Sequence, residues 1–573
     1  MKKALALLLT ILLLVSAFSG CGAQTESSVA ASVPQEAASV PTAEEPAQAP
    51  EDPPAEEEPV SAEETISVAE SEPEPIVIEY PVSDNSVSFE IFTMTPARVD
   101  SIADIVSFEE SAQRTGVGIE WREVAFLAWT ESLNLMMASG DYADMAVGST
   151  MQSATGSLTA DQAIEQNILV DLTDYLEESA PDYYQLLQED AAMLREIRTP
   201  EGAISAFWQI YEDVVGIRGD LIRQDWLDEQ GLEVPETYNE LYDVLKVFKS
   251  AYDCDHPYLM NKTASSYYQL NAGYDIAGYR CGESNVGMFV KEDIIRCTLL
   301  EDGFKEYIEM LNKWYSEGLI GKDFTSIESS FMDGTRKELF LTDEAGVMYV
   351  SNNGSVEYPE QAQDPDFAMT PLKHITKEKG GIVHFTEDYS RLNNNVVIFT
   401  ACDDVELACN FLNYFYTEEG SLLATYGIEG VDWDYNDAGK PEFTDKVMKH
   451  ESLTPSMAMQ TVTMSSGWIG LYPTDIKTYF YGEQQFTNAE VWMSNCDSEY
   501  VLIGVTAPLA EDADDYNSKL SDITTYADTM VLSFIIGEQP LSEWDGFIET
   551  IKSMGIEDCV AALQRAYDHS LEV

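Results

Sequence analysis

From residue 80 onward, the apolar residues switch repeatedly between the spacing of a strand and the spacing of a helix. Val87, Phe89 and Ile91 alternate with polar residues, as in a half-buried strand. The sequence then predicts a helix near 102–106, a strand at 119–121, a helix through 133–137 and a strand at 145–147. This alternation is typical of an α/β domain with a largely parallel sheet.

Helices are expected to dominate the second half of the chain. Thr237 and Glu240 have the spacing of a capping box behind Pro235, so a helix should begin there. Aromatic and aliphatic residues then recur with helical spacing in the segments 241–248, 304–315, 405–415 and 544–551. Such stripes are more often buried core than cofactor contacts, and we expect them to pack inside the protein.

Size and charge exclude several kinds of protein. A chain of 573 residues is too long for one hydrophobic core, so two or three compact units are expected. With 102 Asp and Glu against 31 Lys and Arg, the formal net charge is −71. Such a surface repels nucleic acids and anionic lipid headgroups, so we exclude nucleic-acid binding. The same charge favours a soluble monomer.

The first 20 residues have the layout of a secretory signal. A short basic start precedes an apolar run over 4–18, and Ser19-Gly20-Cys21 follows. Small residues before a cysteine resemble a bacterial lipobox, although Phe18 stands where Leu is usual. We expect 1–20 to be removed and Cys21 to carry a lipid anchor, which two acyl chains make stable. The alternative is an ordinary signal with a chance cysteine.

Residues 21–78 are expected to form an anchored tether rather than a folded domain. After the cysteine, this segment is rich in Pro, Glu, Ala and Ser and contains no aromatic residue, Lys or Arg. It therefore cannot bury enough apolar area to offset its conformational entropy. No later segment reaches transmembrane length, so we expect the folded body to lie outside the cytoplasm.

Seven further cysteines are scattered along the chain, and there are only five histidines. No Cys-x-x-Cys occurs, so a zinc site is not expected. Unpaired buried thiols are the favoured interpretation, and a bridge between Cys281 and Cys297 is the alternative. The seven residues are Cys254, Cys281, Cys297, Cys402, Cys409, Cys496 and Cys559.

The short motifs of common catalytic sites are absent from the sequence. There is no Gly-x-Ser-x-Gly and no His-Glu-x-x-His, and Gly321-Lys322 is followed by Asp323 instead of Ser or Thr. We therefore expect no enzyme activity. Among so many acids, however, a carboxylate pair at the separation of a glycosidase can arise by chance.

One acidic segment resembles part of a calcium loop. Asp432, Asp434 and Asn436 alternate as the first ligands of such a loop do. The positions that require Gly and Glu hold Asp437 and Phe443 instead. A polar turn is therefore the favoured interpretation, and calcium binding is the weaker one.

Five segments resemble one protein family in the family's own order. LNLMMASGDYADM at 133–145 is similar to a helix–loop–strand segment of extracellular solute-binding protein family 1, which serves carbohydrate ABC transporters, and especially of its LipO-like lipoproteins. Here Ala143 replaces the Pro that precedes Asp144 in the family. The segments 216–249, 314–324, 426–437 and 534–558 also resemble this family. The resemblance covers the chain from about residue 85 to its end.

The resemblance implies an α/β fold of the periplasmic-binding-protein-like type II. In this fold two α/β lobes are joined by a hinge and close over a ligand in the cleft between them. We expect lobe 1 over 79–215 with 370–425, and lobe 2 over 216–369 with 426–573.

Candidate ligand-binding residues follow from where such sites lie. In parallel α/β sheets the ligand lies beyond the carboxyl ends of the strands, and a sugar site needs polar groups together with flat aromatic faces. The resemblance adds Asp144. For the aromatic residues core packing is the alternative, and for the polar ones a solvated turn. The candidates are Thr95, Arg98, Asp144, Gly148, Ser149, Thr150, Trp208, Tyr211, Asn352, Asn353, Asp432, Trp433 and Trp468.

Together these features predict the substrate-binding component of an ABC importer. It would capture a small hydrophilic solute, with an oligosaccharide favoured, and deliver it to a membrane permease. The protein should be a monomer without a cofactor, anchored by lipid to the extracellular face of the bacterial cytoplasmic membrane. One alternative is a peptide or amine binder, in which Asp432 and Asp434 beside Trp433 attract a cation. A surface hydrolase or an adhesin is the other.

Overall fold

A computed structural model describes the compact part of the chain. The expected signal, Cys21 and most of the expected tether lie outside the described residues. Residues Pro73–Val573 form one compact unit. The structure describes residues 76–572, except for 96–98, 126–127, 149–157, 215, 217, 262–269, 278–285, 328–333, 387–388, 465–466, 474–475, 477–481 and 504–506.

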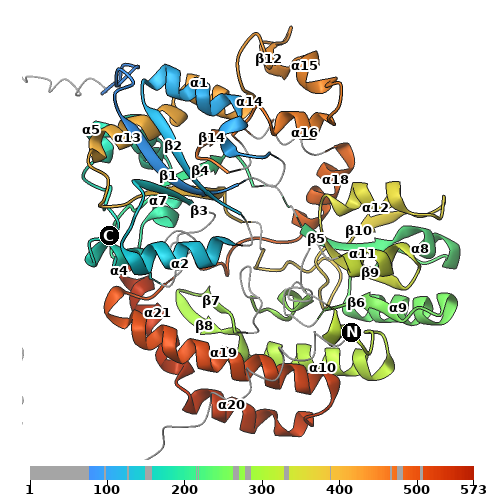
Figure 1. Ribbon diagram of the computed structural model, residues 1–573. Helices are drawn as coiled ribbons and strands as arrows, with labels where there is room; N and C mark the ends of the chain where they lie inside the picture. Colours follow the sequence, from blue (N-terminus) through green and yellow to red (C-terminus); the bar gives the residue numbers. More distant parts are fainter. Residues whose placement is uncertain are drawn as a thin grey trace, which may run out of the picture. The chain divides into compact units, whose positions relative to one another are not determined.

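The first sheet has six strands in the order β14-β4-β11-β3-β1-β2 (Figure 1). Strand β11 runs antiparallel to both of its neighbours, and the other pairs are parallel. The amino end of β11 therefore lies at the same edge as the carboxyl ends of the other five strands. The strands are β1 (Ser88–Met94), β2 (Gly118–Val124), β3 (Met145–Gly148), β4 (Phe207–Tyr211), β11 (Leu392–Ile398) and β14 (Gly470–Tyr472).

Helices bury both faces of the first sheet. Ile91 of β1 lies in the same core as Phe108 of α1 (Val106–Thr115) and Phe411 of α13 (Val405–Asn413). On the opposite face, Phe92 stacks on Trp129 of α2 (Trp129–Ser139), with ring centres 4.8 Å apart. Figure 1 shows α1 and α2 on opposite sides of the strands. Further helices here are α4 (Ala160–Glu165), α5 (Leu176–Ser179), α6 (Pro181–Glu189), α7 (Ala191–Ile197) and α14 (Glu418–Tyr426).

The second sheet has four strands in the order β10-β5-β9-β6. Strand β5 is antiparallel to β10 and β9, while β6 and β9 are parallel. Ile222 and Val347 face one core, and Leu221 and Met348 face another, so this sheet too is buried on both sides. The strands are β5 (Arg218–Arg223), β6 (His256–Leu259), β9 (Ala345–Ser351) and β10 (Met369–Pro371).

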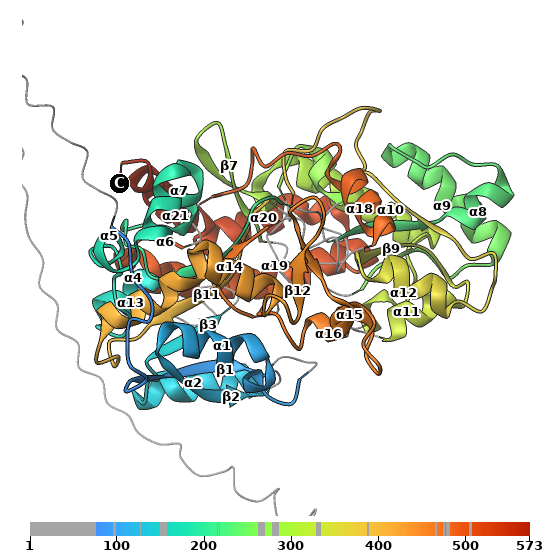
Figure 2. The same cartoon turned by 90° about the horizontal axis from the view of Figure 1, so that it is seen from above.

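Two groups of helices cover the faces of the second sheet, and Figure 2 shows them from above. The two sheets with their covering helices confirm the predicted α/β architecture. One core contains side chains from α8 (Gln224–Gln230), α9 (Tyr238–Tyr252), α10 (Asp302–Glu317), α19 (Ala513–Ile536), α20 (Trp544–Ser553) and α21 (Ile556–Ser570). The other core contains side chains from α11 (Gly334–Leu341), α12 (Gly354–Gln361) and α18 (Glu483–Met493).

The four predicted helical stripes are confirmed, and their ends follow from the capping chemistry. Thr237 accepts from the Glu240 N–H at the start of α9, as the capping box predicts. Gly116, Gly140 and Gly318 end α1, α2 and α10 in the left-handed conformation, which glycine adopts without strain. The apolar stripes of α9, α10, α13 and α20 are buried.

Sheet membership departs from the predicted boundaries in two places. Strand β14 falls in the segment assigned to lobe 2, but it pairs with β4 of the first sheet. Most of β10 falls in the segment assigned to lobe 1, but it pairs with β5 of the second sheet. Both strands have only three residues, which is too short for a hydrophobic period to reveal.

Smaller elements complete the body. The hairpin β12–β13 (Trp433–Tyr435 and Pro441–Phe443) packs with α15 (Asp445–Met448) and α16 (Pro455–Met459) around a small core of its own. A second hairpin joins β7 (Met288–Lys291) to β8 (Ile294–Cys297). Among the described residues, no helix combines the length and the apolar character needed to cross a membrane.

The buried cysteines of the described residues are free thiols, as the sequence indicated. Five are buried and Cys496 is half-buried, while Cys281 lies outside the described residues. Since Cys297 is free, the alternative of a bridge to Cys281 is not seen. Burial raises the pKa of the Cys254 and Cys297 thiols to about 12, which keeps them protonated and unreactive at neutral pH. The five buried cysteines are Cys254, Cys297, Cys402, Cys409 and Cys559.

Helix α18 is attached to the second sheet through one close contact. The indole of Trp492 lies over Gly219 of β5, and its N–H donates to the carbonyl oxygen of Asp220 at 3.1 Å. A β-carbon at Gly219 would lie 2.3 Å from the indole ring, well inside van der Waals contact. Only glycine therefore lets this helix approach the sheet so closely.

We predict that Gly219→Ala destabilises the protein by roughly 1–3 kcal/mol, the usual cost of overpacking a core. Urea unfolding followed by circular dichroism measures the change. Gly546→Ala is the matched control, since a β-carbon at Gly546 of α20 meets nothing within 4 Å. That substitution should be neutral or slightly stabilising. Equal stability of the two variants would contradict the account of the Trp492 contact.

Candidate functional site

Three residues form a row across the middle of the first sheet, near its carboxyl edge. Asn395 of β11 is the register partner of Gly148 on β3 and of Trp208 on β4. Side chains alternate along a strand, so Asn395 points to the same face as Val397, which lies in the core beneath α2. Gly148 and Trp208 were both predicted from the sequence, and the strand order brings them to either side of Asn395.

Asn395 is the most unusual member of this row. Its side chain is 0% exposed, and neither of its amide atoms has a hydrogen-bond partner in the described part of the chain. Leaving a buried polar group unpaired costs about 1–3 kcal/mol, and nearly all such groups in proteins are paired. A fold tolerates this cost where a ligand supplies the partner, so Asn395 is a candidate recognition group.

More amides and aromatic rings lie at the same edge. The Oε1 atom of Gln209 accepts from the Nδ2 atoms of Asn393 at 3.1 Å and Asn394 at 2.7 Å. The rings of Tyr211 and Tyr472 lie 5.7 Å apart at 49°. Tyr211 is half-buried and Tyr472 is fully buried. Amides near aromatic rings are the groups that a site for a polyhydroxylated solute needs.

The other candidates from the first sheet are placed differently. The hydroxyl of Thr95 donates to Glu123 at 3.0 Å and is thus occupied by a local bond. Asp144 precedes β3, at the opposite edge from Gly148, where its carboxylate accepts from the Glu90 N–H at 2.8 Å and ties β3 to β1. Arg98, Ser149 and Thr150 lie outside the described residues.

The candidates after β9 belong to a buried amide network instead of a solvated turn. Asn352 is buried, and its Nδ2 donates to the carbonyl of Gln485 at 2.7 Å. Its Oδ1 accepts from Asn488 at 3.3 Å, and Asn353 Oδ1 accepts from Gln485 Nε2 at 3.1 Å. These bonds join the end of β9 to α18, so the network holds the helix in place.

Two of the tryptophan candidates are core residues in this structure. Trp433 is 2% exposed, and its indole N–H donates to the carbonyl of Gly427 at 2.9 Å. Trp468 is 0% exposed, and its ring meets that of Phe108 edge-on at 5.1 Å. Core packing, the alternative interpretation, thus describes both rings.

The acidic segment next to Trp433 is a polar turn with satisfied ligands. One carboxylate oxygen of Asp432 pairs with Lys446 at 2.6 Å, and the other accepts from the Ile428 N–H at 2.9 Å. Asn436 accepts from the Ala438 N–H at 3.0 Å within the turn between β12 and β13. The oxygens that a calcium loop would use on Asp432 and Asn436 therefore already accept hydrogen bonds or ion pairs within the hairpin.

The second sheet contains a buried acid that the sequence analysis missed. Asp220 of β5 is 6% exposed and accepts from the hydroxyl of Tyr258 at 3.0 Å. Burial raises the pKa of Asp220 to about 7, against the opposing effects of the Tyr258 hydrogen bond and the charge of Arg336. No motif marks this residue, because its acidity depends on packing between distant segments.

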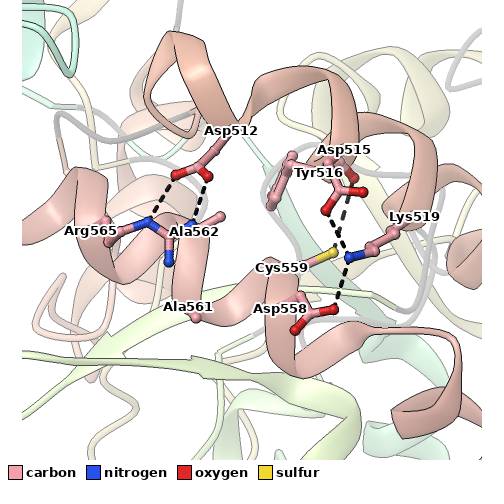
Figure 3. Close-up of a pocket in the computed structure, with 9 residues that line it drawn as sticks. All are labelled: Asp512, Asp515, Tyr516, Lys519, Asp558, Cys559, Ala561, Ala562 and Arg565. Atoms are coloured by element: carbon pink, nitrogen blue, oxygen red, sulfur yellow. Dashed lines mark hydrogen bonds and ion pairs between the residues drawn. The ribbon is translucent and has the colours of Figure 1, made fainter. Parts of the chain in front are cut away.

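A pocket of about 310 Å3 lies between α19 and α21 (Figure 3). Its charged side chains pair with one another, since Lys519 pairs with Asp515 and Asp558 while Arg565 pairs with Asp512. None of the predicted site residues lines it. The pocket therefore lies apart from the row of side chains on the first sheet, and we do not assign the ligand site to it.

Comparison with known families identifies the kind of protein. A family model described as bacterial extracellular solute-binding protein matches residues 100–421. The chain belongs to this family. The resemblance found in the sequence is thereby confirmed, and the protein is a solute-binding protein that acts outside the cytoplasm.

Two curated relatives cover most of this solute-binding protein. The fructooligosaccharide ABC transporter substrate-binding protein FusA of Streptococcus pneumoniae serotype 4 is 22% identical over 80% of this chain and 85% of its own length. Lipoprotein LipO of Bacillus subtilis is also 22% identical, over 80% of this chain and 87% of its own length.

A solved structure supports the fold of this solute-binding protein. The alginate-binding protein AlgQ2 superposes with a TM-score of 0.67 at 20% identity, covering 85% of this chain and 99% of the other. The predicted class, an α/β protein of the periplasmic-binding-protein-like type II, is confirmed.

Asn393, Asn394 and Asn395 were missed by the sequence analysis for a topological reason. Parallel sheets place their ligands beside the residues that follow each strand, and the candidates were taken from there. Because β11 is antiparallel, its first residues lie at that same edge. The signal that was available is a run of three Asn directly before the apolar segment 396–399.

We predict that Asp220 makes stability fall as the pH rises. The pKa of Asp220 is about 7 in the folded protein against an ordinary 3.8, so the folded state binds more protons between these values. The contribution of Asp220 is therefore greatest below about pH 4 and is lost progressively up to about pH 7.

Asp220→Asn removes this titration and preserves an oxygen that accepts from Tyr258. The stability of the variant relative to the wild type should rise between pH 4 and 7, by up to ~4 kcal/mol at ~1.4 kcal/mol per pKa unit. Thermal unfolding at a series of pH values measures the difference. A difference that does not change with pH would refute the account.

Proposed function

We propose that the protein captures an oligosaccharide outside the cell and delivers it to the permease of an ABC importer. Family membership supports the capture of a solute. The names of FusA, which refers to fructooligosaccharide, and AlgQ2, which refers to alginate, support a carbohydrate. The observation that carries the proposal is the buried, unpaired amide of Asn395 between Gly148 and Trp208.

The chemistry of this row suits a sugar. An Asn side chain offers a donor and an acceptor, and a sugar hydroxyl does the same, so one hydroxyl satisfies either atom of Asn395. The half-buried Trp208, the register partner of Asn395, provides a flat face for the apolar C–H patches of a pyranose. The half-buried Tyr211 at the end of β4 points to the other face of the strand. Binding then replaces an unpaired group by a paired one, which is favourable.

We propose that lobe 1 is built on the first sheet and lobe 2 on the second. Under this proposal β14 belongs to lobe 1 and β10 to lobe 2, as their pairing partners indicate. The lobes close over the bound sugar about a hinge, and the ligand must contact both of them to shift the balance from open to closed. The closed form is the one presented to the permease.

Anchoring completes the proposal. Cys21 carries the lipid, the acidic tether separates the body from the membrane surface, and the protein acts as a monomer. Binding is reversible and needs neither a covalent step nor a cofactor. The amine-binding alternative loses its support from the sequence, because Asp432 is already paired with Lys446 and Trp433 is buried.

Calorimetry of the full chain against a panel of oligosaccharides tests the function. We expect at least one sugar to bind, and small-angle X-ray scattering of that complex should show a smaller radius of gyration than the free protein. Heat released with a peptide or polyamine panel, and with no sugar, would overturn the carbohydrate assignment.

We predict that Asn395→Leu weakens sugar binding by roughly 5- to 150-fold, the equivalent of about 1–3 kcal/mol. The same change should leave stability unaltered or improved, because it removes a buried amide that has no partner among the described residues. Calorimetry and thermal unfolding measure the two effects.

Asn413→Leu is the matched control for this variant. Asn413 is also 0% exposed, but it accepts from the Asp182 and Tyr183 N–H groups and donates to the Asp182 carboxylate. Its replacement should lower stability and leave the affinity of the folded protein unchanged. If Asn395→Leu lost stability and kept affinity, Asn395 would be a structural residue.

A further inference from the structure

A histidine and two acids from distant parts of the chain meet at the surface. The Nδ1 atom of His384 lies 3.1 Å from both carboxylate oxygens of Asp497 and 3.3 Å from Oε2 of Glu499. One ligand atom from each of the three residues lies within 4.8 Å of the others. His384 and Asp497 are 113 positions apart, so only the fold creates this cluster.

Backbone hydrogen bonds hold the two segments together. Val383 donates to Asn495 and accepts from Asp497, both at 3.0 Å, and Tyr500 donates to the carbonyl of His384 at 2.8 Å. The three side chains therefore project from segments whose positions are fixed on both sides of the cluster.

The charges of the cluster are not balanced by the protein. A single ring nitrogen supplies at most one proton, yet three carboxylate oxygens converge on His384 Nδ1. No Lys or Arg of the described segments forms an ion pair with Asp497 or Glu499. The nearby Lys291 is paired with Asp275 at 2.7 Å. Asp497 Oδ1 also accepts from the Glu499 N–H at 3.0 Å, but this hydrogen bond does not neutralise either carboxylate. A divalent cation would balance both carboxylate charges, whereas one proton on His384 balances only one of them.

The two distances from His384 Nδ1 to the carboxylates also fit a coordinated ion. Two ligands that each lie about 2.1 Å from a tetrahedral Zn²⁺ are about 3.4 Å apart, close to the observed 3.1 and 3.3 Å. The side chains of His384, Asp497 and Glu499 are 32%, 46% and 64% exposed, so water can reach the remaining coordination position. Imidazole with carboxylates suits Zn²⁺, whereas Mg²⁺ and Ca²⁺ prefer oxygen alone.

We propose that His384, Asp497 and Glu499 form a binding site for a zinc-like divalent cation. His384 contributes Nδ1, and the two acids contribute one or more carboxylate oxygens each. His384 lies on the connection from β10 of the second sheet to β11 of the first, and Asp497 lies between α18 and α19. A bound ion would fasten these two connections to each other, independently of the sugar site.

Calorimetric titration of the chelator-treated full chain with ZnCl2 tests the proposal. Excess MgCl2 is included, because a chain with a net charge of −71 attracts cations at many carboxylates. His384→Gln retains every acid and removes only the imidazole. The wild type should bind one more Zn²⁺ than His384→Gln. Added Co²⁺ should give d–d absorption bands with the wild type and not with His384→Gln.

Two further variants make the test specific. His450→Gln, which alters an exposed histidine whose Nδ1 accepts from backbone N–H groups, should behave like the wild type. Asp497→Asn should weaken Zn²⁺ binding by more than the roughly 10–100-fold typical of a lost outer-shell partner. Equal Zn²⁺ stoichiometry in the wild type and His384→Gln would overturn the site and show that the cluster is an ion pair only.

Discussion

The antiparallel insertion of β11 between β3 and β4 is the constraint on which the site depends. Its hydrogen bonds to both neighbours bring residues from before 150 and after 390 into one sheet. The same pairing turns the amino end of β11 toward the edge where the parallel strands end. Val396, Val397 and Ile398 bury this strand on both faces, so its position is fixed by the largest cores of the first sheet.

Much of the fold could be predicted from the sequence, because long amphipathic segments carry their own signal. The stripe of α10 and the capping box of α9 identify helices without any knowledge of their partners. Three-residue strands carry no such signal, and for this reason the sequence could not show that β10 pairs with β5 and β14 with β4. Their place is decided by the neighbour with which they pair.

The site was predictable only in part, for a related reason. Gly148 follows from the rule that ligands lie beyond parallel strands, and Trp208 and Tyr211 were selected as aromatic residues near the expected lobe crossings. Asn395 follows from neither, since it became a candidate because its amide has no partner among the described residues, and partners exist only in the folded chain. Trp433 and Asp432 show the converse, because residues with the right chemistry for a ligand are used by the fold itself.

The buried free thiols determine how this protein resists oxidation outside the cell. Its five buried cysteines are protected by packing alone, with no covalent cross-link among the described residues. The thiols are therefore protected only while the chain is folded. A chain that unfolds outside the cell exposes several thiols together, and these can then be alkylated or form mixed disulfides. The amount of thiol oxidation in such a molecule would therefore reflect how often it had unfolded. Rapid folding after export limits this oxidation.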